Sequence, residues 1–167
     1  MKEIFLKNGF SKFSNFIDNK EIEQIRLIYD QILDDIEGTA HLRSDLSGKG
    51  DIGEEKITQI MCPSNLSKTL KKSKTYKKAL THAQHLLGED MSLDFDMLIN
   101  KKPYTDTPTP PHQDAAYWIK MPDKRAVSYW IAIDKATKKN GCMWFIPKKK
   151  NEIKPHHAAI IGGALSC

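Results

Sequence analysis

Residues 102 to 111 contain four prolines and three threonines. Proline fixes its own φ and has no N–H to donate, so this stretch can be neither a helix nor a central strand, and we expect an extended loop. The loop ends at His112-Gln113-Asp114. If the chain continues there as a strand, successive side chains alternate in direction, so His112 and Asp114 project together while Gln113 points away.

A converging imidazole and carboxylate provide two of the three ligands in the 2-His-1-carboxylate arrangement that holds non-haem Fe(II). The open positions of that arrangement accept an oxidant and a co-substrate beside the metal. The same pair also fits two plainer interpretations, a pair of surface residues or a hydrogen-bonded pair on a strand. These residues alone leave all three interpretations open, so the rest of the chain has to discriminate among them.

Two helical regions precede the proline-rich loop. Asp18 is suited to cap the first helix, and Glu21, three residues later, to close a capping box. Apolar residues recur at helical spacing from there to Gly38, where we expect the helix to end. They are Ile22, Ile25, Tyr29, Ile32, Leu33 and Ile36. A second helical region begins at Pro63 and ends before Gly88.

Four segments have the pattern of strands. Residues 56–60 alternate as a short strand, after a polar loop over residues 39–55. Residues 92–100 alternate apolar and polar side chains, which predicts a strand with one buried face. That face consists of Leu93, Phe95, Met97 and Ile99. Residues 126–133 and 142–146 follow as partner strands, joined by a turn at Asn140-Gly141.

Composition limits the classes of protein that this chain can belong to. Its 167 residues indicate one domain over residues 1–167. No apolar run approaches the roughly 20 residues that span a bilayer, and no signal-peptide core follows Met1, so we expect a cytoplasmic protein with no membrane partner. The three cysteines indicate neither a disulfide framework nor a zinc site. The net charge of +5 comes from lysine, with only three arginines, so we expect no nucleic-acid partner.

Taken in order, several motifs resemble those of the phytanoyl-CoA dioxygenase (PhyH) family. They are Met97 to Lys101, His112 to Asp114 with Tyr117-Trp118, Val127 to Asp134, Asn140 to Cys142 and Ile146-Pro147. The resemblance implies an α+β domain with a double-stranded β-helix (jelly-roll, cupin-like) core and amino-terminal helices packed on one sheet. It also implies Fe(II) and 2-oxoglutarate as cofactors, with O₂ and a small organic or acyl-thioester molecule as substrates.

The resemblance also assigns roles to particular residues. It makes His112 and Asp114 the metal ligands, and Lys56, Met97 and Trp130 the residues that bind 2-oxoglutarate. Each of the last three has a plainer interpretation as well. Lys56 fits an exposed strand lysine, while Met97 and Trp130 fit core positions in a sheet. We therefore expect a hydroxylase site, with these alternatives left open.

The chain departs from the family pattern near its end. Pro147-Lys148-Lys149-Lys150 stands where the family has Pro-Gly-Ser/Thr-His, so a glycine turn and a histidine are missing. The family's distal histidine and the arginine beyond it come from later strands. By the resemblance neither His156 nor His157 is the third ligand, and the residues alone leave either of them open as one. We therefore expect this chain to be an amino-terminal portion of a longer protein, with a β-helix that is incomplete at the C-terminus.

Two further functions compete with the hydroxylase. One is a non-catalytic β-helix binding module, or an inactive fragment whose metal site is incomplete. The other is a lysine-driven polyanion binder, because six lysines fill the outer face of the second helical region. They are Lys68, Lys71, Lys72, Lys74, Lys77 and Lys78. Such runs are usually solvated helix surface. His82 and His85 on the same helix are expected to be partly exposed helix residues, not ligands.

Overall fold

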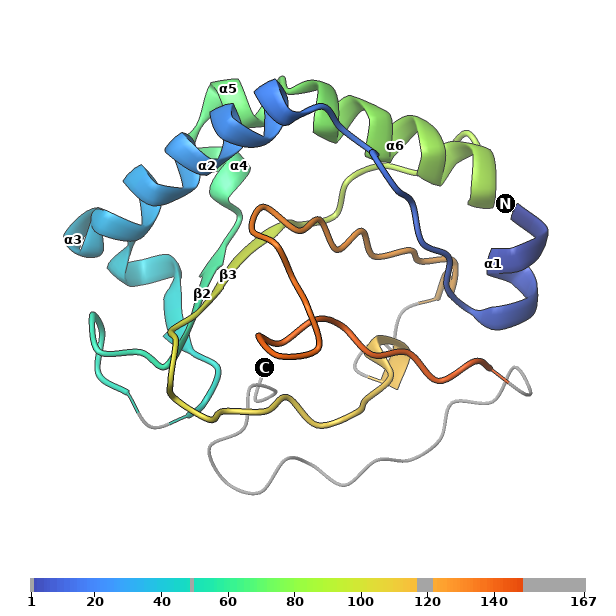
Figure 1. Cartoon of the computed structure of the whole chain (residues 1–167). Helices are drawn as coiled ribbons and strands as arrows, with labels where there is room; N and C mark the ends of the chain where they lie inside the picture. Colours follow the sequence, from blue (N-terminus) through green and yellow to red (C-terminus); the bar gives the residue numbers. More distant parts are fainter. Residues whose placement is uncertain (1, 49, 117–121, 149–167) are drawn as a thin grey trace.

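The computed structural model describes residues 2–48, 50–116 and 122–148 (Figure 1). The helices of these residues are α1 (Lys2–Asn8), α2 (Asn19–Asp34), α3 (Ile36–Thr39), α4 (Pro63–Leu66), α5 (Lys68–Lys71), α6 (Lys74–Leu87) and the 3₁₀ turns η1 (Ala40–Leu42) and η2 (Asp114–Ala116). The strands are β1 (Arg43–Asp45), β2 (Ile57–Met61) and β3 (Met97–Lys101). None of the described helices is both long enough and apolar enough to cross a membrane.

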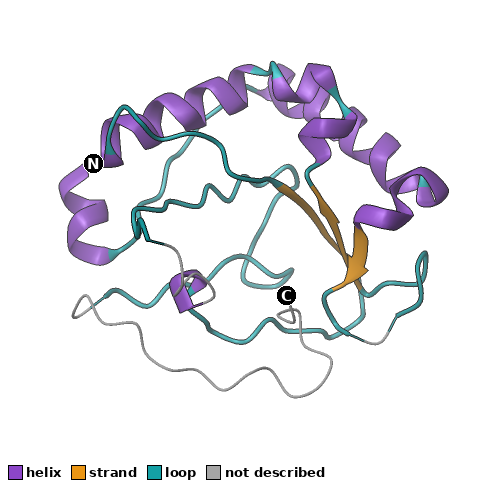
Figure 2. Cartoon of the chain, turned by 180° about the vertical axis from the view of Figure 1, so that it is seen from behind, coloured by secondary structure: helices purple, strands orange, loops and turns teal. Residues whose placement is uncertain are grey.

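The three strands form one antiparallel sheet in the order β1-β2-β3, in which Ile60 pairs with both Arg43 and Leu98. Helices α2 and α6 form an arch above the sheet in both views (Figures 1 and 2). Ile32 of α2 packs against Ile60 and Leu98 to form the core between them. The expected α+β class with helices on one face of a sheet is confirmed.

Helix α2 begins where the sequence predicts, because the Asp18 side chain accepts a hydrogen bond from the Glu21 N–H at 2.8 Å. The predicted capping box is wrong. Glu21 is buried, and its Oε1 accepts hydrogen bonds from the N–H and the hydroxyl of Thr75, both at 3.0 Å. The carboxylate therefore satisfies a donor in the first turn of α6 and joins the two long helices, which lie far apart in the sequence.

Serine and aspartate caps divide the helical regions more finely than the apolar spacing predicts. Asp35 accepts from the Gly38 N–H and starts α3, so α2 ends at Asp34 and not at Gly38. Ser67 and Ser73 each accept from an N–H three residues on, which breaks the second region into α4, α5 and α6. Helix α6 ends before Gly88 as predicted, and the φ of Gly88, +133°, favours glycine.

The buried face of β3 is the opposite of the one predicted. Leu98 is 1% exposed, whereas Met97 is 39% and Ile99 45% exposed. The reason is that α2 covers the side of the sheet that carries Leu98 and Ile60, so the predicted apolar face lies on the other side of the sheet. The sequence also missed β1, because its three polar residues lie inside a segment predicted to be loop.

The predicted strands 126–133 and 142–146 do not form, since both segments are irregular between residues 122 and 148. A strand needs a neighbouring strand for its backbone hydrogen bonds, and no described strand lies beside them. The predicted turn between them is confirmed. The Thr137 carbonyl accepts from the N–H groups of Asn140 and Cys142, and Gly141 has a φ of +90°. The described sheet is thus three-stranded, and the double-stranded β-helix stays a prediction.

Candidate metal and co-substrate site

His112 and Asp114 come together at the end of the proline-rich loop. The distance from His112 Nε2 to Asp114 Oδ1 is 3.2 Å, and the side chains are 27% and 50% exposed. The backbone there is not the strand assumed from the sequence, because Asp114 opens the turn η2. The two side chains therefore do approach each other as predicted. A tight turn brings them together, and not the alternation of side chains along a strand.

A backbone carbonyl indicates the tautomer of the His112 ring. The Pro110 oxygen lies 2.9 Å from His112 Nδ1, and a carbonyl can only accept, so Nδ1 carries the hydrogen of this bond. In the neutral imidazole the lone pair is then on Nε2, the atom that faces the Asp114 carboxylate. Two acceptors at this distance repel each other unless a cation, either a proton or a metal ion, lies between or beside them. Such a carbonyl bond to the second ring nitrogen is usual for metal-binding histidines.

Ser128 is a functional candidate that the sequence did not single out. Its hydroxyl donates to Asp114 Oδ2 at 3.2 Å, which leaves Oδ1 directed at His112. The bond joins residues from the proline-rich loop and from the irregular segment 14 positions later. A serine in an apolar segment carries no signal by itself, and only the fold brings it to Asp114.

The described residues supply two candidate ligands and not three. Within residues 2–48, 50–116 and 122–148, no group of three or more His, Cys, Asp or Glu side chains is arranged to hold a metal ion. His156 and His157 lie outside the described residues. The pair at His112 and Asp114 therefore has the right donor chemistry for Fe(II) but is not a complete site in the part of the chain that is described.

Met97 lies on the side of the sheet away from the helices. Its sulfur is 2.6 Å from Gln59 Nε2, and the same nitrogen is 3.2 Å from the sulfur of Met61. Because the side chain is 39% exposed, the alternative of a core methionine is wrong in this structure. Met97, Gln59 and Ile99 give this open face a mainly apolar surface with one amide in its centre.

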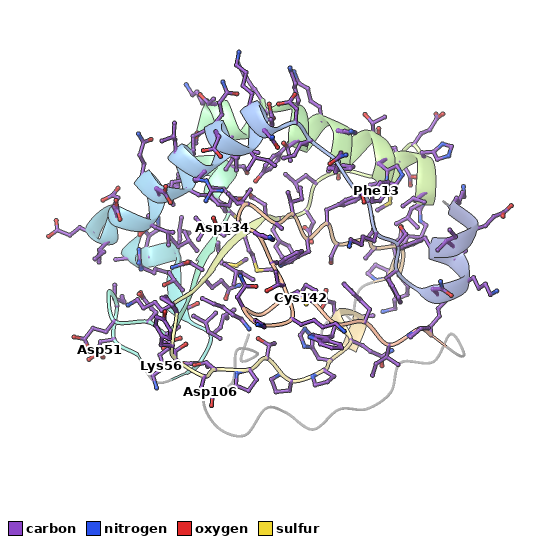
Figure 3. The ribbon with its side chains drawn as sticks, viewed as in Figure 1. Phe13, Asp51, Lys56, Asp106, Asp134 and Cys142 are labelled. Atoms are coloured by element: carbon purple, nitrogen blue, oxygen red, sulfur yellow. The ribbon has the colours of Figure 1, made fainter. Side chains whose placement is uncertain are left out.

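Lys56 is exposed and precedes β2. Its carbonyl accepts from the Lys102 N–H at 3.0 Å, which continues the pairing of β2 with β3. Met97 pairs with Met61 at the other end of the same ladder, so Lys56 and Met97 are separated by roughly 17 Å along and across the strands. Figure 3 shows Lys56 at the lower corner of the sheet, far from α6. The structure does not bring Lys56 to Met97, and its role stays a prediction.

The loop beside Lys56 is organised by Asp45. This carboxylate accepts from the hydroxyl and N–H of Ser47 and from the N–H groups of Lys56 and Ile57. Burial acts to raise the pKa of Asp45, but these hydrogen bonds outweigh it and lower the pKa to about 2. The start of β2 is therefore held to β1 by an ionised carboxylate at all ordinary pH values.

Trp130 is 49% exposed, so it is not the core residue of its alternative interpretation. It lies two residues after Ser128, and the segment that carries both therefore runs past the Asp114 carboxylate. Its neighbour Tyr129 points elsewhere and makes a hydrogen bond of 2.8 Å with His82 Nδ1.

Two surface depressions lie at the C-terminal end of α6 and between α2 and α5, and neither includes His112 or Asp114.

Comparisons with known proteins agree with the motifs. A family model described as "Phytanoyl-CoA dioxygenase (PhyH)" matches residues 5–160. The human protein "Phytanoyl-CoA dioxygenase, peroxisomal" is 26% identical over 164 residues, 93% of this chain and 48% of the relative. The zebrafish (Danio rerio) protein "Phytanoyl-CoA dioxygenase domain-containing protein 1" is 39% identical over 56 residues, 34% of this chain and 19% of the relative. The chain thus spans at most about half the length of these curated relatives. No solved structure matches it significantly.

Proposed function

Because this chain belongs to the phytanoyl-CoA dioxygenase (PhyH) family, we propose that it carries part of an Fe(II)- and 2-oxoglutarate-dependent hydroxylase. The substrate class is a small organic or acyl-thioester molecule, with O₂ as the oxidant. One observation carries the proposal, the approach of His112 Nε2 to within 3.2 Å of the Asp114 carboxylate. The family's double-stranded β-helix is proposed along with it.

His112 and Asp114 are the residues that would hold Fe(II). The imidazole offers the lone pair of Nε2, since the Pro110 carbonyl fixes the hydrogen on Nδ1. Asp114 offers an oxygen on the same side, and Ser128 keeps the other oxygen occupied. When bound, iron with 2-oxoglutarate and O₂ supplies the oxidising chemistry, in which 2-oxoglutarate becomes succinate and CO₂ and the substrate gains a hydroxyl group.

The other candidates orient the co-substrate and exclude water. Met97 and Trp130 present exposed apolar surface that a bound 2-oxoglutarate molecule would cover. The family resemblance also assigns Lys56 to a carboxylate of 2-oxoglutarate. In the described sheet Lys56 lies roughly 17 Å from Met97, so one 2-oxoglutarate molecule cannot contact both residues in this arrangement. A third metal ligand has to complete the site. The family's distal histidine is the proposed source, because the described residues do not supply one.

The competing proposal is a non-catalytic binding module of the same fold. This module is the function expected if no third ligand completes the pair of His112 and Asp114, the two candidate ligands among the described residues. Both proposals allow binding of a small molecule, but only the first requires that iron and 2-oxoglutarate react. The cytoplasmic location stays a prediction, since one relative is named "peroxisomal".

The test is production of succinate from 2-oxoglutarate with Fe(II) and O₂, measured together with Co(II) binding as a separate readout. We compare the wild-type chain with His112→Ala and Asp114→Ala, and use His41→Ala, an exposed histidine elsewhere, as the control. If the hydroxylase proposal is right, the affinity for Co(II) and the rate of succinate production each fall at least tenfold in His112→Ala and Asp114→Ala. Both stay at the wild-type level in His41→Ala. Metal binding that is unchanged in both site variants would refute the hydroxylase proposal. Binding without succinate production would mean that this chain is either a non-catalytic module or an inactive fragment with an incomplete metal site.

A further inference from the structure

The positive charge of the chain is concentrated in one stretch. Residues 66–88 contain six lysines and no acidic residue, while the whole chain carries a net charge of +5. The remaining residues therefore sum to −1, so the net positive charge of this protein is concentrated in residues 66–88, which include helices α5 and α6. We call Lys68, Lys71, Lys72, Lys74, Lys77 and Lys78 the lysine face.

All six lysines are exposed. Thr75 and Leu86 of α6 are buried, whereas Lys74 and Lys77 are exposed on its outer side. Lys78 is exposed as well, but its Nζ donates to the Phe16 carbonyl and lies 4.8 Å from the centre of the Phe16 ring, so this ammonium is already engaged within the protein. Figure 3 shows nitrogen-tipped side chains that project from the upper side of the helical arch. Helix α6 alone has 14 residues and is about 21 Å long, so the lysine face is an extended surface and not a point.

The lysine face lies away from the candidate metal site. In both views the short turn η2, which carries Asp114, lies on the lower side of the molecule, whereas α5 and α6 form its upper edge (Figures 1 and 2). A small anionic substrate held by these lysines would therefore be on the wrong side of the helices to reach His112. This placement favours a partner that is separate from the substrate.

The type of cation indicates what kind of anion fits. Arg26, Arg43 and Arg125 each form ion pairs within the protein, with Asp134, Glu55 and both Asp90 and Asp123 respectively. No arginine is therefore left for the bidentate contacts by which proteins read bases and nucleic-acid phosphates. Lysines act as point charges without a required geometry, which suits the laterally mobile headgroups of a lipid surface.

An apolar element lies at the C-terminal end of α6, the end farther from the lysine face. Lys2 of α1 donates to the His85 carbonyl at 3.1 Å, which holds α1 against the C-terminal end of α6. Ile4 and Leu6 of α1 are 53% and 50% exposed. Clusters of lysine on the outer face of a helix are typical of proteins that bind anionic lipid headgroups. The apolar side of α6 packs into the protein, so Ile4 and Leu6 are the side chains that add shallow apolar contact.

From these observations we propose that the lysine face docks this protein onto an anionic lipid surface. The lysines contact the headgroups, and Ile4 and Leu6 add apolar contact at one end. The expectation of no membrane partner came from the lack of a spanning segment, which does not bear on surface binding. The proposal does not depend on the hydroxylase, since none of its residues belongs to the candidate metal site.

The experiment is co-sedimentation of the chain with vesicles of phosphatidylcholine alone and of phosphatidylcholine mixed with phosphatidylserine. The test variant replaces Lys68, Lys71, Lys74 and Lys77 with Gln. The matched control replaces Lys102, Lys135, Lys138 and Lys139 with Gln, so both variants change the net charge from +5 to +1. Glutamine keeps the helix propensity, and circular dichroism verifies that both variants are folded.

We expect binding only to the phosphatidylserine vesicles, with affinity that falls as salt rises. Each lysine near such a surface strengthens binding by roughly fivefold, so the test variant should bind at least about tenfold more weakly, and the control much like the wild type.

An equal loss of vesicle affinity in both variants would mean that net charge alone matters and would overturn the proposal. Binding to duplex DNA without binding to vesicles would also overturn it. Ile4→Ser with Leu6→Ser should weaken binding further without changing its dependence on salt.

Discussion

At the scale of single residues, two flanking hydrogen bonds orient the His112–Asp114 pair. The Pro110 carbonyl accepts from the imidazole, and the Ser128 hydroxyl donates to the carboxylate. The first comes from the same loop, so replacing it requires a backbone change. The second comes from a side chain and can be removed cleanly, which makes Ser128 the better test of how the pair is oriented.

We predict that Ser128→Ala weakens metal binding by about tenfold or more, the usual effect of removing a hydrogen bond that orients a metal ligand. The fold should be unaffected, because Ser128 is exposed. A Co(II) titration of the wild type and the variant measures the change. Ser92→Ala, at another exposed serine, is the control. Identical affinities for all three proteins would show that Ser128 does not position Asp114.

Arg43 and Glu55 form the most deeply buried ion pair among the described residues. Arg43 Nε lies 2.6 Å from Glu55 Oε1, with side chains 5% and 1% exposed. The same guanidinium donates to the Leu33 carbonyl at 2.8 Å, and Gly53 donates to the carboxylate. Burial acts to raise the pKa of Glu55, but the hydrogen bonds from Arg43 and Gly53 lower it overall. The pair thus ties the end of α2 to β1 and to the start of β2.

We predict that Arg43→Met lowers the free energy of unfolding by about 3–5 kcal/mol, because it leaves the Glu55 charge buried without a partner. Urea unfolding at neutral pH measures this. The double variant Arg43→Met with Glu55→Leu should recover much of the loss.

In the wild type, Glu55 also makes the free energy of unfolding depend on pH. Its stabilising contribution is fully present above its unfolded pKa, about 4.5, and is lost as pH falls through its lower folded pKa. If the Arg43→Met variant is as stable as the wild type, the ion pair does not stabilise the protein in this way.

At the scale of elements, an aromatic cluster joins three parts of the chain. Phe13 contacts the His82 ring edge to face at 4.7 Å, and Phe16 stacks on Tyr129 at 6.2 Å. Tyr129 OH is hydrogen-bonded to His82 Nδ1 at 2.8 Å. The segment before α2, helix α6 and the irregular segment therefore meet at His82. Burial lowers the pKa of His82, and the nearby His85, Lys78 and N-terminal amine lower it further.

We predict that the protein loses stability as pH falls below about 6.5, the unfolded pKa of histidine. The unfolded chain then binds a proton that folded His82 resists, so the loss continues down to the lower folded pKa. Thermal unfolding between pH 7 and pH 5 measures it. His82→Gln should flatten the slope, and His41→Gln should leave it unchanged. An equal slope in all three proteins would mean that other groups cause it.

Caps and turns could be predicted at this scale, whereas faces and partners could not. Asp18, Gly88 and Asn140-Gly141 act on backbone groups a few residues away, so their effects appear in the sequence. Leu98, in contrast, is buried because α2 lies above it. Glu21 binds Thr75, 54 residues away, and no local pattern shows that contact.

At the scale of the whole molecule, exposed ion pairs hold the irregular segment to the helices. Arg125 forms a bidentate pair with Asp90 just beyond α6, at 2.9 and 2.6 Å. Arg26 of α2 donates to Asp134 and, at 2.8 Å, to the Ile133 carbonyl. Among these contacts, only the Arg26 bond to the Ile133 carbonyl satisfies a backbone group of the segment, and the others join side chains. Figure 1 shows the segment crossing beneath the arch of α2 and α6.

We predict that Arg26→Ala with Arg125→Ala exposes residues 122–148 to protease while the helix–sheet core persists. Brief digestion with chymotrypsin, followed by mass spectrometry, should reveal faster cleavage after Tyr129, Trp130 and Trp144. Lys20→Ala with Lys71→Ala is the control, because it also removes two cations from the helices. Cleavage at the wild-type rate would indicate that the aromatic contacts alone hold the segment.

The sequence by itself determined what depends on neighbours along the chain. It predicted the start of α2, the end of α6, the turn at residues 140–141 and most of β2. It also predicted that His112 and Asp114 lie close together, since only one residue separates them in the chain. The family also followed from ordered motifs. The tertiary structure decided which side of β3 is buried, what Glu21 binds, and that Ser128 reaches Asp114. Those outcomes depend on contacts between residues distant in sequence, and such contacts form only when the whole chain packs.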